Sequence, residues 1–156
     1  MNNFMIKGII FDFGRVLFDS ETKKEFSESE EIVSYCKEKG YKLALVSLVS
    51  PLANATLSER KNQIESSNVY KYLEFVEVTD QDKDKSFDEV VQKMNLPRDQ
   101  ILIVDDRTVR GIKYGNKNGH PTVWLQKGTF ANELPNLETG APTYIIKLLQ
   151  ELKNIV

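Results

Sequence analysis

The sequence contains only one cysteine and one histidine among its 156 residues. The single Cys36 excludes an internal disulfide and any zinc site built on cysteines. The single His120 excludes a multi-histidine metal site and argues against a catalytic triad that depends on histidine. Catalytic chemistry in this chain would therefore have to come from carboxylates, hydroxyls and lysines.

Long hydrophobic runs and a strong charge of either sign are also missing. No stretch approaches the roughly 20 apolar residues that a membrane-spanning helix needs, and the first residues lack the features of a secretory leader. Lys and Arg number 21 and Asp and Glu number 23, and this near-balance argues against nucleic-acid or membrane partners. The length is that of one domain, so we expect a single cytoplasmic domain over residues 1–156.

Short apolar runs alternate with segments of helical periodicity along most of the chain. The predicted strands are residues 8–13, 42–47, 75–78, 101–104, 122–125 and a short one at 144–146. The predicted helices are residues 27–39, capped by Ser27 or Ser29, then 51–66, 87–94, 109–118 and 147–154, with an ordered loop at 128–142. This alternation predicts an α/β fold, a three-layer α/β/α Rossmann-like arrangement with a parallel sheet.

Polar residues lie where several of these strands end. In open parallel sheets, ligands bind beyond the carboxyl ends of the strands. Each residue alone could simply cap or turn the chain, but their gathering at one sheet edge favours a functional site. The residues are Asp12 after the first strand, Ser47 at the end of the second, Lys83 and Lys85 before the helix that leads to the fourth, and Asp105 and Asp106 after the fourth.

The chemistry of this set favours phosphoryl transfer. Converging carboxylates repel one another unless a cation neutralises them, and their oxygens are hard ligands that suit Mg²⁺. A carboxylate beside such a cation can attack phosphorus and form an acyl phosphate. A serine hydroxyl and a lysine ammonium can hold the oxygens of the transferred group.

The order of these residues resembles the motifs of the haloacid dehalogenase superfamily of phosphohydrolases. The string IIFDFGRVLFDS at residues 9–20 is similar to the first motif of the family, and LVS at residues 45–47 is similar to the second. The string IVDDR at residues 103–107, followed by GNKNG and TVW, is similar to the fourth motif and its trailing helix and strand. The resemblance runs from residue 8 to the C-terminus, so it covers most of the chain.

The resemblance assigns roles to the carboxylates. It implies that Asp12 is the nucleophile that becomes phosphorylated and that Asp12 also binds Mg²⁺. It implies further metal contacts through the backbone carbonyl of Gly14 and the carboxylate of Asp106. Asp105 stands where the family usually has glycine, and we expect it to act as a metal ligand, as a partner of the ligands or as a helix cap.

The resemblance also implies a set of phosphate-binding residues. Ser47 would hydrogen-bond the phosphoryl oxygens, with Gly14 and Arg15 beside the phosphate. Two lysines are candidates for the catalytic lysine that also binds the phosphate. Lys83 fits the shorter spacing of the family, and Lys85 is the alternative.

One position departs from the family pattern. Phosphatases of this family usually carry a second aspartate two residues after the nucleophile, where it protonates the leaving oxygen and later activates water. Here that position is Gly14, which can do neither. Two hypotheses follow: a hydrolase of phosphate esters or acyl phosphates that uses another acid, such as Asp19, or prefers good leaving groups; and a phosphate- or metal-binding domain that is weak in turnover or inactive.

The spacing of the motifs leaves no room for a cap domain, because a crossover helix already fills the segment between the first two. We therefore predict a capless, open site that admits a phosphorylated small molecule or macromolecule. A neighbouring subunit of a homo-oligomer would be another way to close such a site. Residues 128–136 are expected to rim the site or an interface between subunits.

Overall fold

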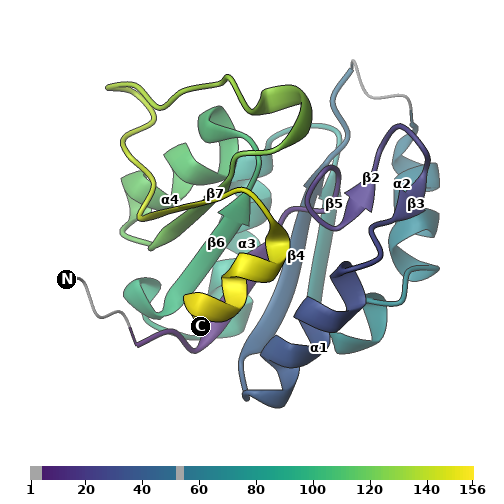
Figure 1. The fold of residues 1–156 in the computed structure, drawn as a ribbon, viewed down its shortest axis with the longest axis horizontal. Coiled ribbons are helices and arrows are strands. Elements are labelled where there is room, and N and C mark those ends of the chain that lie inside the picture. The colour runs from purple at the N-terminus through teal and green to yellow at the C-terminus, as the bar shows by residue number, and fades with distance from the viewer. Residues whose placement is uncertain (1–4, 52–54) are drawn as a thin grey trace.

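A parallel six-stranded sheet forms the centre of the computed structural model, which describes residues 5–51 and 55–156 (Figure 1). The strand order is β5-β4-β1-β6-β7-β8, and every neighbouring pair is parallel. The predicted parallel sheet is therefore confirmed. The strands are β1 (Gly8–Phe11), β4 (Lys42–Leu48), β5 (Phe75–Thr79), β6 (Ile101–Asp105), β7 (Thr122–Leu125) and β8 (Tyr144–Ile146).

Helices cover both faces of this sheet, which confirms the three-layer architecture. On one face lie α1 (Ser29–Glu38) and the C-terminal 3₁₀ helix η5 (Leu149–Asn154), and on the other lie α3 (Lys83–Met94) and α4 (Lys113–Asn118). The remaining helix, α2 (Leu57–Glu65), packs beside the edge strand β5.

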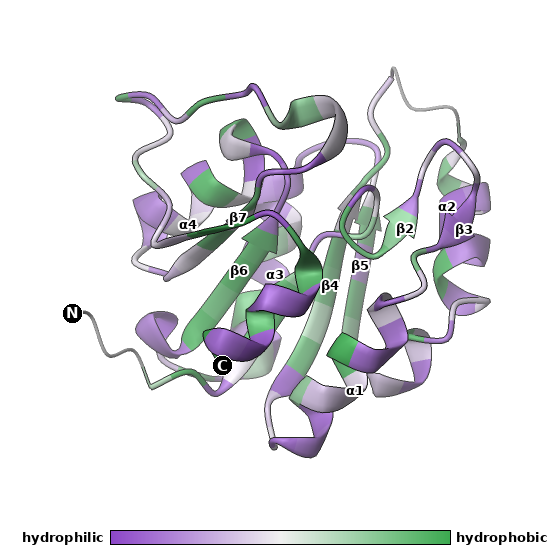
Figure 2. Ribbon diagram, viewed as in Figure 1, coloured by the Kyte–Doolittle hydropathy of each residue, from purple (hydrophilic) through white to green (hydrophobic). Residues whose placement is uncertain are grey.

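The central strands are buried on both faces, as their unbroken apolar sequences predict. In β1, Ile9 and Phe11 belong to the apolar cluster beneath α1, whereas Ile10 belongs to the cluster beneath α3. Figure 2 shows the resulting band of hydrophobic strands between helices with hydrophilic outer surfaces. Burial of these side chains is the main force that holds the sheet together.

The connections of the sheet create one crevice. From β1 the chain proceeds outward to β4 and β5, then returns to the other side of β1 to build β6, β7 and β8. The boundary between β1 and β6 is the point where the direction of winding reverses, and such points hold the ligands of open α/β sheets. The residues that follow β1 and β6 therefore share a crevice at their carboxyl ends.

Several local predictions need correction. The cap of α1 was predicted to be Ser27 or Ser29, but its N-cap is Glu28 without a side-chain cap, because the Ser29 hydroxyl donates instead to the carbonyl of Leu17 at 2.7 Å. The predicted helix at 109–118 divides into a π-helical turn, η3 (Thr108–Ile112), and α4. The predicted C-terminal helix is a 3₁₀ helix.

Lys83 and Lys85 also lie at a different place than predicted. They are in the first turn of α3 rather than before it, because Asp82 caps the helix by accepting hydrogen bonds from the backbone N–H groups of Asp84 and Lys85. The helix predicted at 51–66 begins at Leu57, capped by the Thr56 side chain. Part of that prediction, residues 52–54, lies outside the described residues.

A short hairpin was not predicted. It consists of β2 (Phe18–Asp19) and β3 (Lys24–Glu25), which pair antiparallel between β1 and α1. Three further 3₁₀ turns complete the chain, η1 (Tyr70–Tyr72), η2 (Arg98–Gln100) and η4 (Gly128–Phe130), the last within the predicted loop. Among the described residues, no helix combines the length and the apolar character needed to cross a membrane.

Candidate active site

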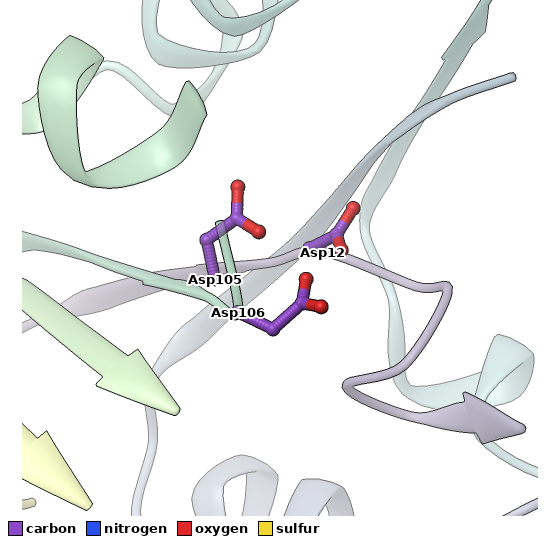
Figure 3. Close-up of side chains that lie close together, drawn as sticks. All are labelled: Asp12, Asp105 and Asp106. Atoms are coloured by element: carbon purple, nitrogen blue, oxygen red, sulfur yellow. The ribbon is translucent and has the colours of Figure 1, made fainter. Parts of the chain in front are cut away.

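Three aspartates meet in the crevice between β1 and β6. Asp12 directly follows β1, Asp105 is the last residue of β6, and Asp106 comes next. Figure 3 shows their side chains close together, and one carboxylate oxygen of each lies within 4.8 Å of the others. All three are buried, so their mutual repulsion is only weakly screened by water.

Lys83 joins two of these carboxylates. Its Nζ lies 3.0 Å from Oδ1 of Asp12 and 3.0 Å from Oδ2 of Asp105. Burial alone would lower the pKa of Lys83, but the charges of Asp105 and Asp12 raise it above its ordinary value, so the ammonium stays protonated. Lys85 is exposed on the same helical turn and lies outside the cluster. The structure thus brings one of the two candidate lysines to the aspartates.

Asp105 is held by donors on every side. Its Oδ1 accepts a hydrogen bond from the backbone N–H of Arg107 at 3.0 Å, and its Oδ2 accepts one from Gly111 at 2.9 Å as well as that of Lys83. Burial would raise the pKa of Asp105, but Lys83 and these donors bring it below its ordinary value. Because both oxygens already have donors, the structure favours Asp105 as a positioning residue rather than a metal ligand.

The carboxylate of Asp106, unlike that of Asp105, accepts no hydrogen bond from the described residues. Both of its carboxylate oxygens are buried, and neither has a hydrogen-bond partner among the described residues. Burial and the nearby charges of Asp105 and Asp12 raise the pKa of Asp106 to about 9. Its backbone carbonyl, by contrast, is fixed by a hydrogen bond of 3.0 Å from the indole of Trp124. A buried carboxylate without donors calls for a partner, and a bound cation is one that would satisfy it.

The cluster as a whole fits a divalent cation. When ionised, three carboxylates and one ammonium leave a formal excess of two negative charges in a buried place. Burial raises the pKa of Asp12 even though Lys83 opposes this effect. Carboxylate oxygens are hard ligands of the kind that Mg²⁺ prefers. The donor set therefore suits Mg²⁺ in both charge and chemistry.

Ser47, the predicted phosphate-binding hydroxyl, lies buried near the end of β4 and has an unforeseen partner. Its Oγ accepts a hydrogen bond of 3.0 Å from Nη1 of Arg60 on α2. Arg60 is itself only 6% exposed, and its guanidinium lies 5.7 Å from the ring centre of Phe13. Arg60 is not among the residues that the sequence predicts for the site. Its only sequence signal is its place four residues before the buried Ile64, on the same face of α2.

An open cavity of about 290 Å³ begins at the aspartates. Two predicted phosphate-binding residues, Gly14 and Arg15, contribute to its wall. Arg15 has a positive φ of 67°, a conformation that is uncommon outside glycine and often found at functional sites. The lining also includes Asp12, Ser20, Glu21, Lys23, Arg60, Asp106, Arg107, Arg110 and Thr129.

The loop after β7 forms one side of the site. Glu133 accepts hydrogen bonds from Nε of Arg107 at 3.0 and 3.2 Å and from the backbone N–H of Val109 at 3.3 Å. Thr129 of the same loop lines the cavity. The segment predicted to rim the site or an interface thus borders the site.

Asp19, considered as a substitute acid, has a structural role. Its carboxylate accepts hydrogen bonds from the backbone N–H groups of Glu21 and Thr22 in the turn of the β2–β3 hairpin. These bonds lower the pKa of Asp19, which is the opposite of what a proton donor needs. Asp19 also does not line the cavity that holds Asp12.

Comparison with known proteins identifies the fold. No protein-family model and no curated protein matches the sequence. Among solved structures, a HAD phosphatase from Thermococcus onnurineus superposes with a TM-score of 0.76 at 12% identity, covering 96% of this chain and 97% of that one. The chain has the haloacid dehalogenase fold. A dehalogenase structure gives a TM-score of 0.78 at 10% identity and 97% coverage of both chains.

A further similar structure contains a metal. A Bacillus subtilis protein assigned as a HAD hydrolase, YfnB, was solved bound to magnesium, and it matches with a TM-score of 0.66 and 19% identity. The match covers 85% of this chain and 56% of that one. The neighbours of this chain are thus phosphatases and dehalogenases of one superfamily, and the fold that the motif residues predicted is confirmed.

Proposed function

We propose that the chain is a Mg²⁺-dependent phosphohydrolase that acts through a phosphoaspartate on Asp12. The observation that carries this proposal is the buried carboxylate of Asp106, which has no hydrogen-bond partner among the described residues and lies beside an aspartate that Lys83 holds in place. The haloacid dehalogenase fold, with phosphatases among its structural neighbours, supports the same reaction class.

In this proposal the chain's own residues fix the nucleophile and the phosphoryl group. Asp12 lines the cavity and attacks phosphorus, while Lys83 orients its carboxylate through Oδ1. Ser47 accepts a hydrogen bond from Arg60, so its own hydroxyl proton remains free to be donated to a phosphoryl oxygen. Asp105 holds Lys83 in position. When bound, Mg²⁺ would be held by Asp12, Asp106 and the carbonyl of Gly14, and would supply positive charge to the phosphoryl group.

A second candidate function is a phosphate- or metal-binding domain without turnover. The observation in its favour is Gly14, which provides no general acid at the position where relatives usually carry one. The metal site and the buried serine would serve such a domain equally well. Turnover is what separates the two functions.

We further propose that the site acts without a cap domain and accepts a phosphorylated small molecule or macromolecule from solvent. The supporting observation is that only the short β2–β3 hairpin and α1 lie between β1 and β4. Lys85 stays outside the proposed phosphate site because it is exposed and, unlike Lys83, makes no ion pair with the aspartates.

The experiment is phosphate release from p-nitrophenyl phosphate and acetyl phosphate, with Mg²⁺ or with EDTA. We expect release that needs Mg²⁺ and disappears in Asp12→Asn. Asp19→Asn is the matched control, because it makes the same substitution seven residues away at a turn carboxylate. Release that survives both EDTA and Asp12→Asn contradicts the proposal. Tight Mg²⁺ binding without release supports the binding domain.

A further inference from the structure

The space beside Gly14 is occupied by an arginine. A Cβ built on Gly14 would lie 3.1 Å from Nη1 and 3.7 Å from Nη2 of Arg60, and 3.2 Å from the hydroxyl of Ser20. A longer side chain at this position would enter the volume that the guanidinium fills. A fixed cation therefore lies beside the position two residues after Asp12, where relatives usually carry their second aspartate.

Arg60 carries a buried charge without an ionic partner. Its hydrogen bonds go to the neutral side chains of Ser47 and Gln63, and no carboxylate of the described residues lies within 4.0 Å of it. A buried charge is costly unless it is paired. Because Arg60 lines the cavity that contains Asp12, an anionic ligand is the partner that the site can admit.

Other cations line the same cavity. Arg15 and Arg110 likewise have no carboxylate within 4.0 Å among the described residues, whereas Arg107 is paired with Glu133. Of the acidic lining residues, Asp12 and Asp106 belong to the metal cluster and Glu21 is exposed. The wall around Arg60 is therefore suited to a negatively charged fragment of a substrate.

We propose that Arg60 binds the leaving group, and that the substrates are phosphoryl compounds whose leaving group departs as an anion: acyl phosphates or phosphoric anhydrides. This inference rests on the proposed phosphohydrolase function. An Asp12 oxygen forms a bond to phosphorus, and the bond from phosphorus to the bridging oxygen breaks. The electron pair stays on that oxygen, which leaves as a carboxylate or a phosphate and accepts hydrogen bonds from Arg60.

No proton is needed in that step. A guanidinium donates hydrogen bonds but does not give up its proton at physiological pH. It can therefore stabilise an anionic leaving group, but it cannot protonate an alkoxide to give an alcohol. Water then attacks the phosphorus of the phosphoaspartate, the Asp12 oxygen departs as carboxylate, and the protons of the water leave with the phosphate or pass to solvent. Alkyl phosphates, whose leaving oxygen needs a proton, are the substrates that this site disfavours.

The first test compares leaving groups on the unmodified protein with Mg²⁺. The substrates are acetyl phosphate, pyrophosphate and glycerol phosphate. The two anhydrides should exceed glycerol phosphate in kcat/KM by about 100-fold or more, the range of general acid catalysis that the alkyl ester lacks here. The ratio of kcat/KM for acetyl phosphate to kcat/KM for pyrophosphate then tells whether the preferred leaving anion is a carboxylate or a phosphate. Equal rates on all three substrates overturn the proposal.

The second test removes the cation. Arg60→Gln should lower kcat/KM for the favoured anhydride about 10- to 100-fold, the range for a lost charged hydrogen bond. It should change the rate on glycerol phosphate much less, and Arg60→Lys should recover part of the loss. Arg98→Gln, at an exposed position on η2, is the matched control and should change neither rate. A loss equal on all substrates would mean that Arg60 only positions Ser47, and it overturns the proposal.

A binding measurement keeps the inference separate from turnover. Asp12→Asn, loaded with Mg²⁺, should bind pyrophosphate, and adding Arg60→Gln should weaken that binding about 10-fold or more. Adding Arg98→Gln should not. If no substrate is hydrolysed but this difference remains, the phosphohydrolase proposal fails while the anion site on Arg60 stands. If the difference is missing in folded protein, the role of Arg60 fails whatever the turnover.

Discussion

The backbone N–H of Gly111 donates a hydrogen bond of 2.9 Å to Oδ2 of Asp105, and a Cβ on Gly111 would lie 2.5 Å from that same oxygen. The close approach explains why a residue without a side chain stands at position 111. Glycine lets the π-helical turn η3 close onto Asp105. Such turns are often found at functional sites.

Gly111→Ala should therefore disturb the aspartate cluster strongly, although it adds only one methyl group. The added methyl would push η3 away from Asp105 and release Lys83, so we expect a loss of about 2 to 4 kcal/mol in unfolding free energy together with most Mg²⁺-dependent activity. Gly119→Ala is the control, because its positive φ of 80° disfavours a side chain but, beyond its two chain neighbours, no atom of residues 5–51 or 55–156 lies within 4 Å of the added Cβ. It should cost about 1 kcal/mol and spare activity. Equal losses in urea unfolding would contradict the close-contact explanation.

Asp106→Asn should separate stability from metal binding. In metal-free protein the fold keeps a buried carboxyl group beside two other aspartates without donors, so the amide should raise the melting temperature in EDTA. Mg²⁺ should raise the melting temperature of the unmodified protein and leave that of the variant almost unchanged. Thermal melts with EDTA and with Mg²⁺ test both expectations. Equal stabilisation of the two proteins by Mg²⁺ would remove Asp106 from the metal site.

The pattern of correct and missed residues has a physical explanation. Asp12 and Asp106 could be predicted because each directly follows an apolar strand, and strand ends in a parallel sheet converge. The place of Arg60 in the cavity wall could not, because it depends on contact with Ser47, thirteen residues away, and on the absence of a side chain at Gly14. Helical periodicity places Arg60 on the same face of α2 as Ile64, but it does not tell which groups its guanidinium meets.

Local hydrogen bonds explain other misses. Ser29 has the residue type of an N-cap, but its hydroxyl reaches the carbonyl of Leu17, which belongs to a segment that only the fold brings near. The strands β2 and β3 have two residues each, too few for any alternation of polar and apolar residues to appear. Sequence reasoning was therefore strong for the central sheet and weak for the loops around the cavity.

His120 should make folding sensitive to mild acid. Its Nδ1 lies 2.8 Å from the carbonyl oxygen of Arg98, and its Nε2 is buried without a partner among the described residues. Burial lowers the pKa of His120 below 6.5, so the folded state keeps the ring neutral. Below pH 6.5 His120 binds a proton in the unfolded chain but stays neutral in the folded chain. The free energy of unfolding therefore decreases as the pH decreases, by up to about 1.4 kcal/mol per pH unit.

Above pH 6.5 both states hold a neutral ring, so His120 contributes no pH dependence there. Urea unfolding one pH unit above and below this value measures the effect. In His120→Asn the acidic decline should be shallower, because aspartates and glutamates titrate mainly at lower pH. The same decline in both proteins would assign it to other groups.

The pair between Arg107 and Glu133 should matter more than surface pairs. It is partly buried and made of several hydrogen bonds, with Nη2 to Oε2 at 3.0 Å. We expect Glu133→Gln to cost about 1 to 2 kcal/mol and to speed amide hydrogen exchange at residues 128–136. Glu77→Gln breaks the exposed pair with Lys93 and should cost less than about 0.5 kcal/mol. Unchanged exchange in the loop would show that Glu133 does not hold it.

The two bonds of Lys83 also bear on how the protein reaches its native state. They join positions 71 and 22 residues apart in the chain, through two different crossovers of the sheet. Contacts of such large sequence separation form late, because the loops between them must close first. An intermediate containing only β1, β4 and β5 would hold Asp12 but lack Asp105. Recovery of the proposed Mg²⁺-dependent phosphate release during refolding should therefore lag behind recovery of secondary structure, and would report completion of the whole sheet.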